Sequence, residues 1–205
     1  MWLLWLAVTV VAGYLLGNLN GAIIASKLLG DDVRTHGSGN AGLTNFIRSY
    51  GANRALLVIL IDAGKGVLAC LLGGMLLRFK LGFPAGAAVG GTAVMLGHML
   101  PVYFDFRGGK GILTGLFIAV VVDYRVALLI LAVFAIFYFP TRFVSLSSVM
   151  ASVAFAVGFV IFHYHNPVTM ACGVFMGAMA VFMHRSNIVR LIKGQETKTD
   201  LFKKL

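Results

Sequence analysis

Residues 112–139 read ILTGLFIAVVVDYRVALLILAVFAIFYF, an apolar run that is interrupted in its middle by Asp-Tyr-Arg at 123–125. A helix that crosses a bilayer needs about 20 apolar residues, and charged side chains at the bilayer centre are costly. We therefore expect two short membrane helices, 112–122 and 126–139, separated by a turn at the polar residues.

The rest of the chain has the same apolar character. Of its 205 residues, 60% are hydrophobic and 12% are charged, about half the charged share of a soluble domain. A single domain of this size cannot hide so much apolar surface from water, so lipid must be the solvent. Further runs of spanning length lie at roughly 2–26, 55–78, 84–104, 143–163 and 167–183. The sequence therefore predicts one all-α domain, 1–205, folded as a polytopic transmembrane bundle with seven spans.

Basic residues are distributed unevenly over the loops of this arrangement. Thirteen of the 17 Lys and Arg residues fall on one side, three fall on the other, and Lys65 lies within a helix. The basic side consists of 27–54, 105–111, 140–142 and 184–205. The positive-inside rule places that side in the cytoplasm and the N-terminus outside. A single span over 112–139 would move the basic tail outside, so the charges favour seven spans.

The net charge of +10 bears on the choice of partner. Because the basic residues lie between apolar runs, they favour an anionic membrane surface or an anionic substrate over nucleic acid. Cys70 and Cys172 lie inside apolar runs and form no disulfide or zinc pattern. His163 and His165 lack a third ligand nearby. We expect neither a metal nor a cofactor.

The first polar segment, 37–48, reads Gly-Ser-Gly-Asn-Ala-Gly-Leu-Thr-Asn-Phe-Ile-Arg. Glycine permits a close approach of backbone to ligand, and consecutive N–H groups can form an anion-binding nest. Arg48 adds a forked cation that suits phosphate. These features favour an anion site over a flexible loop. Its candidate residues are Gly37, Ser38, Gly39, Asn40, Thr44, Asn45 and Arg48.

The second polar segment runs from Gly97 to Thr114 and contains Gly-Gly-Lys-Gly at 108–111, where a helix is expected to begin. Free N–H groups at a helix N-terminus attract anions, and Lys110 adds a positive charge. The spacing differs from a Walker A loop, which argues against nucleotide hydrolysis. Gly108, Gly109 and Gly111 are the accompanying candidates. His98 is interpreted as a packed core residue.

The third polar segment is the basic tail that begins at His184. His184 and Asn187 are three residues apart and share a helix face, which could point into a site. Arg185 is a further candidate, whereas the other basic residues could simply hold anionic lipid. Glu196 is expected to tie the tail to a loop by a structural ion pair. Within a predicted span, Asp62 and Lys65 are expected to pair, for structural or functional reasons.

The three segments resemble the three signatures of the bacterial acyl-phosphate:glycerol-3-phosphate acyltransferases, in order, spacing and predicted placement. The matching stretches are Gly37 to Arg48, Gly97 to Gly111 and His184 to Glu196. The resemblance covers essentially the whole chain. It implies an enzyme of the bacterial inner membrane that moves an acyl group from acyl phosphate to the sn-1 hydroxyl of glycerol 3-phosphate. The site would face the cytoplasm, and we expect a monomer.

The resemblance also assigns roles to particular residues. Ser38 and Arg48 match essential positions of the first signature, and Lys110 with its glycines matches a phosphate-binding loop. His184 and Asn187 match a functional pair, and Glu196 matches a structural acid. The reaction can proceed with His184 as base or with a substrate phosphate oxygen taking the proton. We favour the second route, and a covalent acyl group on Ser38 is the least favoured.

Two other classes of membrane protein are less consistent with the sequence. A transporter would spread polar residues along a path and often shows repeats, whereas here the polar residues gather on one face. A CDP-alcohol phosphotransferase needs several aspartates on membrane helices, and this chain lacks them. The His-x4-Asp motif of acyl-CoA-dependent acyltransferases is absent, since residue 103 is tyrosine and residue 189 is valine.

Overall fold

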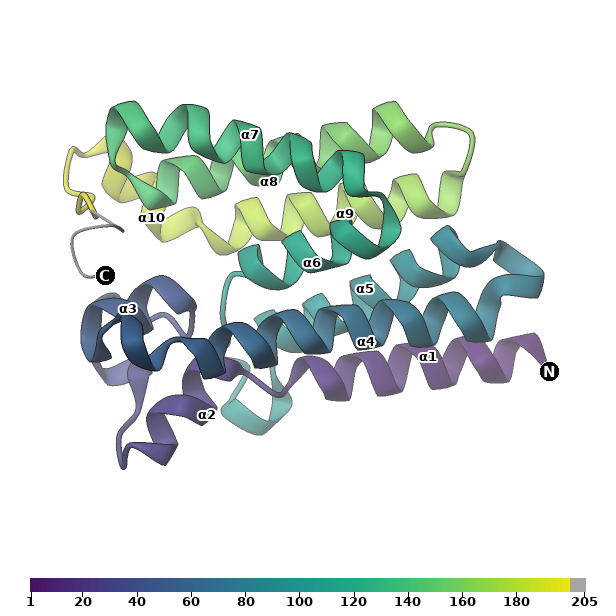
Figure 1. Cartoon of the computed structure of the whole chain (residues 1–205), viewed down its shortest axis with the longest axis horizontal. Coiled ribbons are helices and arrows are strands. Elements are labelled where there is room, and N and C mark those ends of the chain that lie inside the picture. Colours follow the sequence, from purple (N-terminus) through teal and green to yellow (C-terminus); the bar gives the residue numbers. More distant parts are fainter. Residues whose placement is uncertain (200–205) are drawn as a thin grey trace.

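The computed structural model describes residues 1–199, and every regular element in this part of the chain is helical (Figure 1). The α-helices are α1 (Trp2–Gly17), α2 (Gly21–Leu28), α3 (Leu43–Tyr50), α4 (Leu56–Leu81), α5 (Phe83–Met99), α6 (Ile112–Val122), α7 (Tyr124–Thr141), α8 (Val144–His163), α9 (Pro167–Met183) and α10 (Arg185–Ile192). The loops contain short 3₁₀ helices η1 (Val33–Thr35), η2 (Ala52–Arg54) and η3 (Val102–Phe104). Lys203 and Lys204, which entered the charge argument, lie outside the described residues.

Four of the described helices are long and apolar enough to cross a membrane: α4, α5 with its extension to Phe104, α7 and α8. Two further candidates are the bent pairs α1 with α2 and α9 with α10. The remaining apolar helix, α6, has 11 residues. The predicted all-helical membrane fold is confirmed. The count of seven spans requires α6 to serve as a short span and stays a prediction.

Two boundaries differ from the sequence-based expectation. The predicted span 2–26 is broken, because α1 ends at Gly17 and α2 starts after a bend of 40°. The side chain of Asn20 accepts a hydrogen bond from the Ile23 amide and caps α2, which favours a new helix start over continuation. Similarly, Asp123 accepts from the Arg125 amide. Helix α7 therefore starts at Tyr124 and has 18 residues, longer than the predicted 126–139.

The helices form two groups with α6 between them (Figure 1). Helices α1, α4 and α5 pack together on one side, and α7, α8 and α9 pack on the other. Glycines bring the first group into backbone contact, since a Cβ on Gly90 would lie 2.1 Å from the Ala69 carbonyl oxygen, and one on Gly97 would lie 2.1 Å from that of Tyr14. The expected close approach of helices through glycine is confirmed here.

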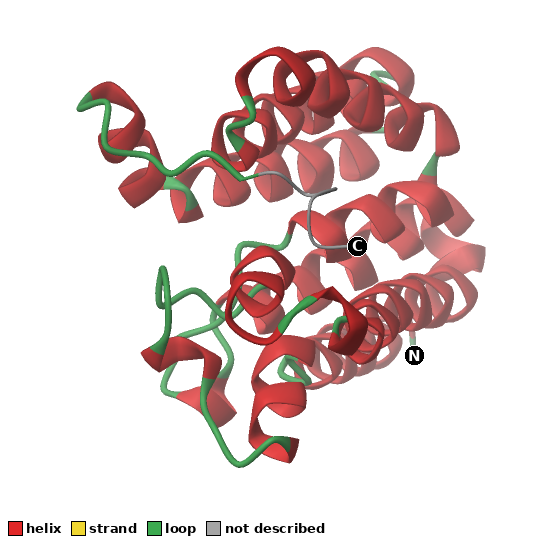
Figure 2. Cartoon of the chain, turned by 60° about the vertical axis from the view of Figure 1, so that its left-hand side comes forward, coloured by secondary structure: helices red, strands yellow, loops and turns green. Residues whose placement is uncertain are grey.

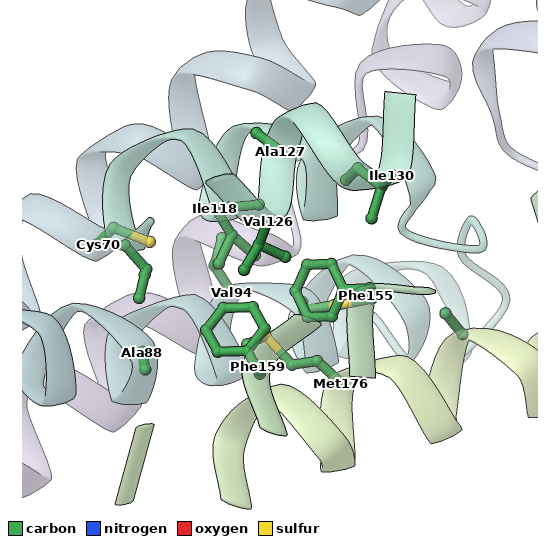
Figure 3. Close-up of a cluster of buried hydrophobic side chains, with 14 of the residues drawn as sticks. Cys70, Ala88, Val94, Ile118, Val126, Ala127, Ile130, Phe155, Phe159 and Met176 are labelled. Atoms are coloured by element: carbon green, nitrogen blue, oxygen red, sulfur yellow. The ribbon is translucent and has the colours of Figure 1, made fainter. Parts of the chain in front are cut away.

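A buried apolar cluster joins the two groups (Figure 3). Val94 comes from α5, Ile118 from α6, Phe155 and Phe159 from α8, and Met176 from α9. Ile118 has no exposed surface, so the short α6 is part of the core. This packing fixes the start of α6 relative to both helix groups.

The polar segments lie at one end of the molecule. Helices α2, α3 and α10 all occupy the end opposite the N-terminus (Figure 1). Figure 2 turns this end toward the viewer and shows that many of the loops gather there. The bundle therefore brings the first and third polar segments to one face, next to the loop that precedes α6.

Candidate active site

The first polar segment is a loop organised around Asn45 of α3. The side-chain oxygen Oδ1 of Asn45 accepts a hydrogen bond from the backbone amide of Ser38 at 3.0 Å. A Cβ on Gly37 would lie 2.4 Å from the same oxygen. The Asn45 amide group donates to the carbonyls of Val33, His36 and Asn40. Asn45 was predicted to bind substrate, but its side chain is engaged within the loop. Its contacts shape the loop.

The other predicted residues of this loop are more accessible. Gly37, Ser38 and Gly39 are exposed, whereas Asn40 and Thr44 are half-buried. Gly37 and Gly39 have φ angles of 55° and 69°, a region that favours glycine. Ser38 is therefore an exposed residue in a loop of fixed shape.

The second segment forms a tight loop against the end of α5. The Gly109 amide donates to the His98 carbonyl at 3.1 Å, and a Cβ on Gly108 would lie 2.0 Å from that oxygen. A Cβ on Gly109 would lie 2.2 Å from Nε2 of His98 and 2.7 Å from the Ala41 carbonyl oxygen. Gly111, with φ of 78°, caps α6. Only glycine fits at positions 108, 109 and 111. The contact between Gly109 and Ala41 also brings the second segment against the first.

Lys110 projects from this loop into a group of basic side chains. Its ammonium group donates to the side-chain oxygen of Asn187 on α10. Burial lowers the pKa of Lys110 to about 8, and the positive charges of Arg190 and Arg48 act in the same direction, while Glu196 opposes them. Three cations thus lie within electrostatic reach of one another. Such a concentration of positive charge favours an anionic ligand.

The buried His184 stands at the junction of α9 and α10. Its Nδ1 lies 2.8 Å from the Ala180 carbonyl oxygen, and since a carbonyl can only accept, Nδ1 carries the hydrogen and Nε2 of the neutral ring is an acceptor. Burial and the nearby Lys110 charge lower the pKa of His184 to about 4. His184 is therefore neutral at physiological pH and a weak base.

Glu196 anchors the third segment from within the tail. Its carboxylate accepts from Arg190 at 2.8 Å and from Asn187 at 3.0 Å. Burial opposes its ionisation, but these hydrogen bonds outweigh burial and keep the pKa of Glu196 below its usual value. The predicted ion pair to an interhelical loop is wrong: the partner is in α10. Hydrogen bonds link Glu196 to the second segment through Asn187, which also binds Lys110.

The structure treats two predicted arginines differently. Arg48 on α3 donates to the hydroxyl of Thr199, and burial lowers its pKa. It lies in the electrostatic neighbourhood of Arg190 and Lys110. Arg185 is exposed, and its guanidinium lies 4.6 Å from the centroid of the Phe182 ring. The structure therefore does not bring Arg185 to the other candidates.

Arg190 is the residue that sequence reasoning missed. It was interpreted as part of a lipid-binding tail, yet it reaches Glu196 and affects the pKa of Lys110. Its spacing of three from Asn187 was the available signal, because it puts both on one helix face. Among residues 1–199, no three His, Cys, Asp or Glu side chains are grouped as a metal site requires.

A small apolar cavity lies behind residues 108–111, which we call the glycine loop. It is lined by Gly111 and Gly115 at the start of α6 and by residues of four other helices, including Met95, Phe155 and Met176. The polar cluster and this cavity therefore meet at Gly111. The cavity has a volume of only about 30 Å³, so it marks an apolar gap next to the charged cluster.

Long apolar helices that gather several cations at one end are typical of an integral membrane protein with a site for anions. The chain belongs to the glycerol-3-phosphate acyltransferase family, whose sequence model matches residues 7–194. It is 37% identical over 196 residues to a glycerol-3-phosphate acyltransferase of Thermoanaerobacter sp. (strain X514), covering 95% of this chain and 96% of the relative. It is 39% identical over 191 residues to one from Neisseria meningitidis serogroup B, covering 92% and 94%.

Solved structures agree with this membership. The glycerol 3-phosphate form of PlsY (YgiH), an integral membrane glycerol 3-phosphate acyltransferase, superposes with a TM-score of 0.86 at 33% identity, covering 95% of this chain and 96% of that one. Its lysophosphatidic acid form superposes with a TM-score of 0.81 at 34% identity. The protein is thus an integral membrane acyltransferase that uses glycerol 3-phosphate, and the predicted family is confirmed.

Proposed function

We propose that this enzyme takes its acyl group from acyl phosphate and transfers it to the sn-1 hydroxyl of glycerol 3-phosphate. The products are 1-acyl-glycerol 3-phosphate, or lysophosphatidic acid, and inorganic phosphate. The reaction is the first acylation of phospholipid synthesis. The related enzyme has been crystallised in forms with glycerol 3-phosphate and with lysophosphatidic acid. These two molecules correspond to the acceptor and the product.

The observation that carries the proposal is the convergence of Arg48, Lys110 and Arg190 beside the glycine loop. Both substrates carry a phosphate group, and several cations at one site suit two anions better than one. The buried Asn187 binds Lys110 and adds a polar side chain to this group, and we propose that the exposed Ser38 faces the same substrates. We place the start of the acyl chain against the apolar residues that line the small cavity beside Gly111.

The chemistry requires little from the protein beyond orientation and charge stabilisation. The hydroxyl oxygen of glycerol 3-phosphate bonds to the acyl carbonyl carbon, and the bond from that carbon to the phosphate oxygen breaks. Phosphate leaves with the electron pair and the hydroxyl proton goes to a phosphate oxygen. The low pKa of His184 supports this route, because a general base works best when its pKa is near the operating pH. His184 then orients the substrates through Nε2.

The site lies on the cytoplasmic side of the bacterial inner membrane in this proposal, with the N-terminus outside and one chain acting as a monomer. The basic charge of the loops at the site end supports this orientation. An anionic membrane surface and a soluble acceptor such as glycerol 3-phosphate are both accessible from that side.

The direct test is release of inorganic phosphate by purified protein that is given palmitoyl phosphate and glycerol 3-phosphate. We expect release only when both are present, together with lysophosphatidic acid in the lipid extract. Palmitoyl-CoA in place of palmitoyl phosphate serves as the donor control, and no product is expected from it. Formation of lysophosphatidic acid from palmitoyl-CoA and glycerol 3-phosphate, but not from palmitoyl phosphate, would overturn the proposed donor and leave the acyltransferase class intact.

A further inference from the structure

Three ionisable side chains are buried among the helices below the active site. Asp62 and Lys65 on α4 and His98 on α5 are each at most 3% exposed. The Lys65 ammonium lies 2.9 Å from the Asp62 carboxylate and 2.8 Å from Nδ1 of His98. The expected Asp62–Lys65 pair is confirmed, and His98 extends it. Such groups are costly within a membrane protein, which calls for a reason for their presence.

One side of this network holds the break between α1 and α2. Lys65 donates to the carbonyls of Leu19 at 2.8 Å and Gly17 at 3.2 Å, and Asp62 accepts from the Gly21 amide at 3.1 Å. These are backbone groups that a continuous helix would satisfy by itself. The break in turn reaches the first polar segment, because Asn20 donates to the Ala41 carbonyl at 3.1 Å.

The other side of the network supports the glycine loop. Because an ammonium group can only donate, Nδ1 of His98 accepts from Lys65, and the hydrogen of the neutral ring is on Nε2. That nitrogen faces the α-carbon of Gly109, where an added Cβ would lie only 2.2 Å away. The Gly109 amide also donates to the His98 carbonyl. The orientation of the imidazole ring therefore sets the distance between helix α5 and the loop that carries Lys110.

We propose that Asp62, Lys65 and His98 are positioning residues that hold the glycine loop, and with it Lys110, at the correct distance from the first polar segment. This inference rests on the proposed function, since its effect is measured as binding of a phosphate-bearing substrate. The network touches no substrate itself. It acts through the carbonyl of Ala41 and the backbone of Gly108 and Gly109, which meet above it.

A double-mutant cycle tests the inference. His98→Ala removes the ring that supports the loop, and we expect KM for at least one of the two substrates to rise by about tenfold or more, since small displacements of a positioned group are costly. In a Lys110→Ala background the same change should have little further effect, because the group it positions is gone. Effects that multiply independently would overturn the proposal, because they would mean that His98 acts on something other than the loop.

Two further variants separate positioning from folding. The double substitution Asp62→Asn with Lys65→Met removes both charges together and avoids a lone buried charge, and it should reproduce the rise in KM. His163→Ala is the matched control, because His163 faces Asp123 at 3.0 Å at the opposite end of the bundle. It should leave both KM values unchanged. A rise in KM of similar size in His163→Ala would assign the effect to general destabilisation.

The readouts also separate this inference from the function on which it rests. Wild-type protein that releases no phosphate from palmitoyl phosphate would contradict the proposed function. Active wild-type protein with an additive cycle would contradict only the positioning role. Should His98→Ala fail to fold, His98→Asn retains an acceptor for Lys65, and it completes the cycle with the same expected dependence on Lys110.

Discussion

Lys110 is a cation of the site whose pKa lies close to physiological pH. Burial and the neighbouring Arg190 lower its pKa to about 8 from a usual value of 10.5. A cation with a lowered pKa is present below that pKa and is lost above it. We therefore expect KM for a phosphate-bearing substrate to rise as the pH increases through about 8, while the free energy of unfolding increases over the same range, because the unfolded chain holds the Lys110 proton to a higher pH.

The matched variant for this effect is Lys110→Arg. Arginine stays charged throughout the accessible pH range, so the variant should show a weaker binding at neutral pH and no rise in KM at alkaline pH. A bound anion raises the pKa of a lysine, so the loss of rate at alkaline pH should be clearest at substrate concentrations below KM. A rise of the same size in Lys110→Arg would assign the titration to another group.

His184 gives a second prediction at the residue scale. With its pKa lowered to about 4, it does not change charge near neutrality. Phosphate esters have a second ionisation near pH 6, so a break in the pH–rate profile there should belong to the substrate. We expect His184→Gln to lower kcat and to keep that break. Loss of the break in His184→Gln would show that His184 is the base.

The contrast between Asn45 and Arg190 shows what residue types alone can predict. Both carry side chains that suit phosphate, and the sequence places Asn45 in a glycine-rich segment and Arg190 in a basic tail. Asn45 turns inward because four backbone groups of its own loop satisfy it. Arg190 turns toward the site because Glu196 binds it. Such choices depend on tertiary contacts that a linear pattern does not contain.

At the scale of elements, the glycine loop is the most constrained part of the site. A methyl group on Gly109 would meet Nε2 of His98 and the Ala41 carbonyl at once. We expect Gly109→Ala to reduce kcat/KM by about a hundredfold, because displacement of the loop moves Lys110 by a large fraction of an ångström. The measurement is steady-state phosphate release with both substrates varied.

Gly64→Ala is the control for that substitution. Gly64 lies in the interior of α4, and nothing stands within 4 Å of its added Cβ. Alanine is a better helix former than glycine by up to about 1 kcal/mol. This variant should be as active as the wild type and slightly more stable in detergent. Equal losses in both variants would mean that the glycines matter for folding and not for the loop.

Helix boundaries were the less predictable aspect of the elements. The apolar runs identified where the chain is helical, because length and hydropathy suffice for that. The break after Gly17 arises from Asn20, which caps α2. The early start of α7 at Tyr124 arises from Asp123, the N-cap residue. Its carboxylate accepts hydrogen bonds from the backbone amide and the guanidinium of Arg125. An Asn or Asp inside an apolar run is the sequence signal for such a break.

At the scale of the whole molecule, the tail crosses between the two helix groups. Thr199 accepts from Arg48 of α3, and its backbone binds the Arg142 carbonyl and the Tyr138 hydroxyl at the end of α7. We expect truncation after Lys193 to abolish activity, because it also removes Glu196 and releases Asn187 and Arg190. Thermal unfolding in detergent should change little, since the bundle core involves none of the removed residues.

Glu196→Gln distinguishes charge from tethering in the same region. Glutamine keeps one acceptor oxygen, so it retains one of the two hydrogen bonds from Asn187 and Arg190, while the negative charge that opposes the three cations is removed. We expect tighter anion binding with a smaller loss of kcat than the truncation causes. If Glu196→Gln were as inactive as the truncated chain, the carboxylate itself would be required.

The orientation of the molecule decides whether the three polar segments can act together on cytoplasmic substrates. The predicted inner face carries the exposed Lys27 and Lys193, and the predicted outer face carries the exposed Lys80. Single cysteines at these positions, in a background with Cys70→Ala and Cys172→Ala, report their side by reaction with an impermeant maleimide on intact spheroplasts. We expect labelling of Lys80→Cys alone, with the other two labelled only after lysis. Labelling of Lys27→Cys or Lys193→Cys in intact cells would place an anion-binding segment away from the cytoplasm, where a cytoplasmic acyl donor could not reach it.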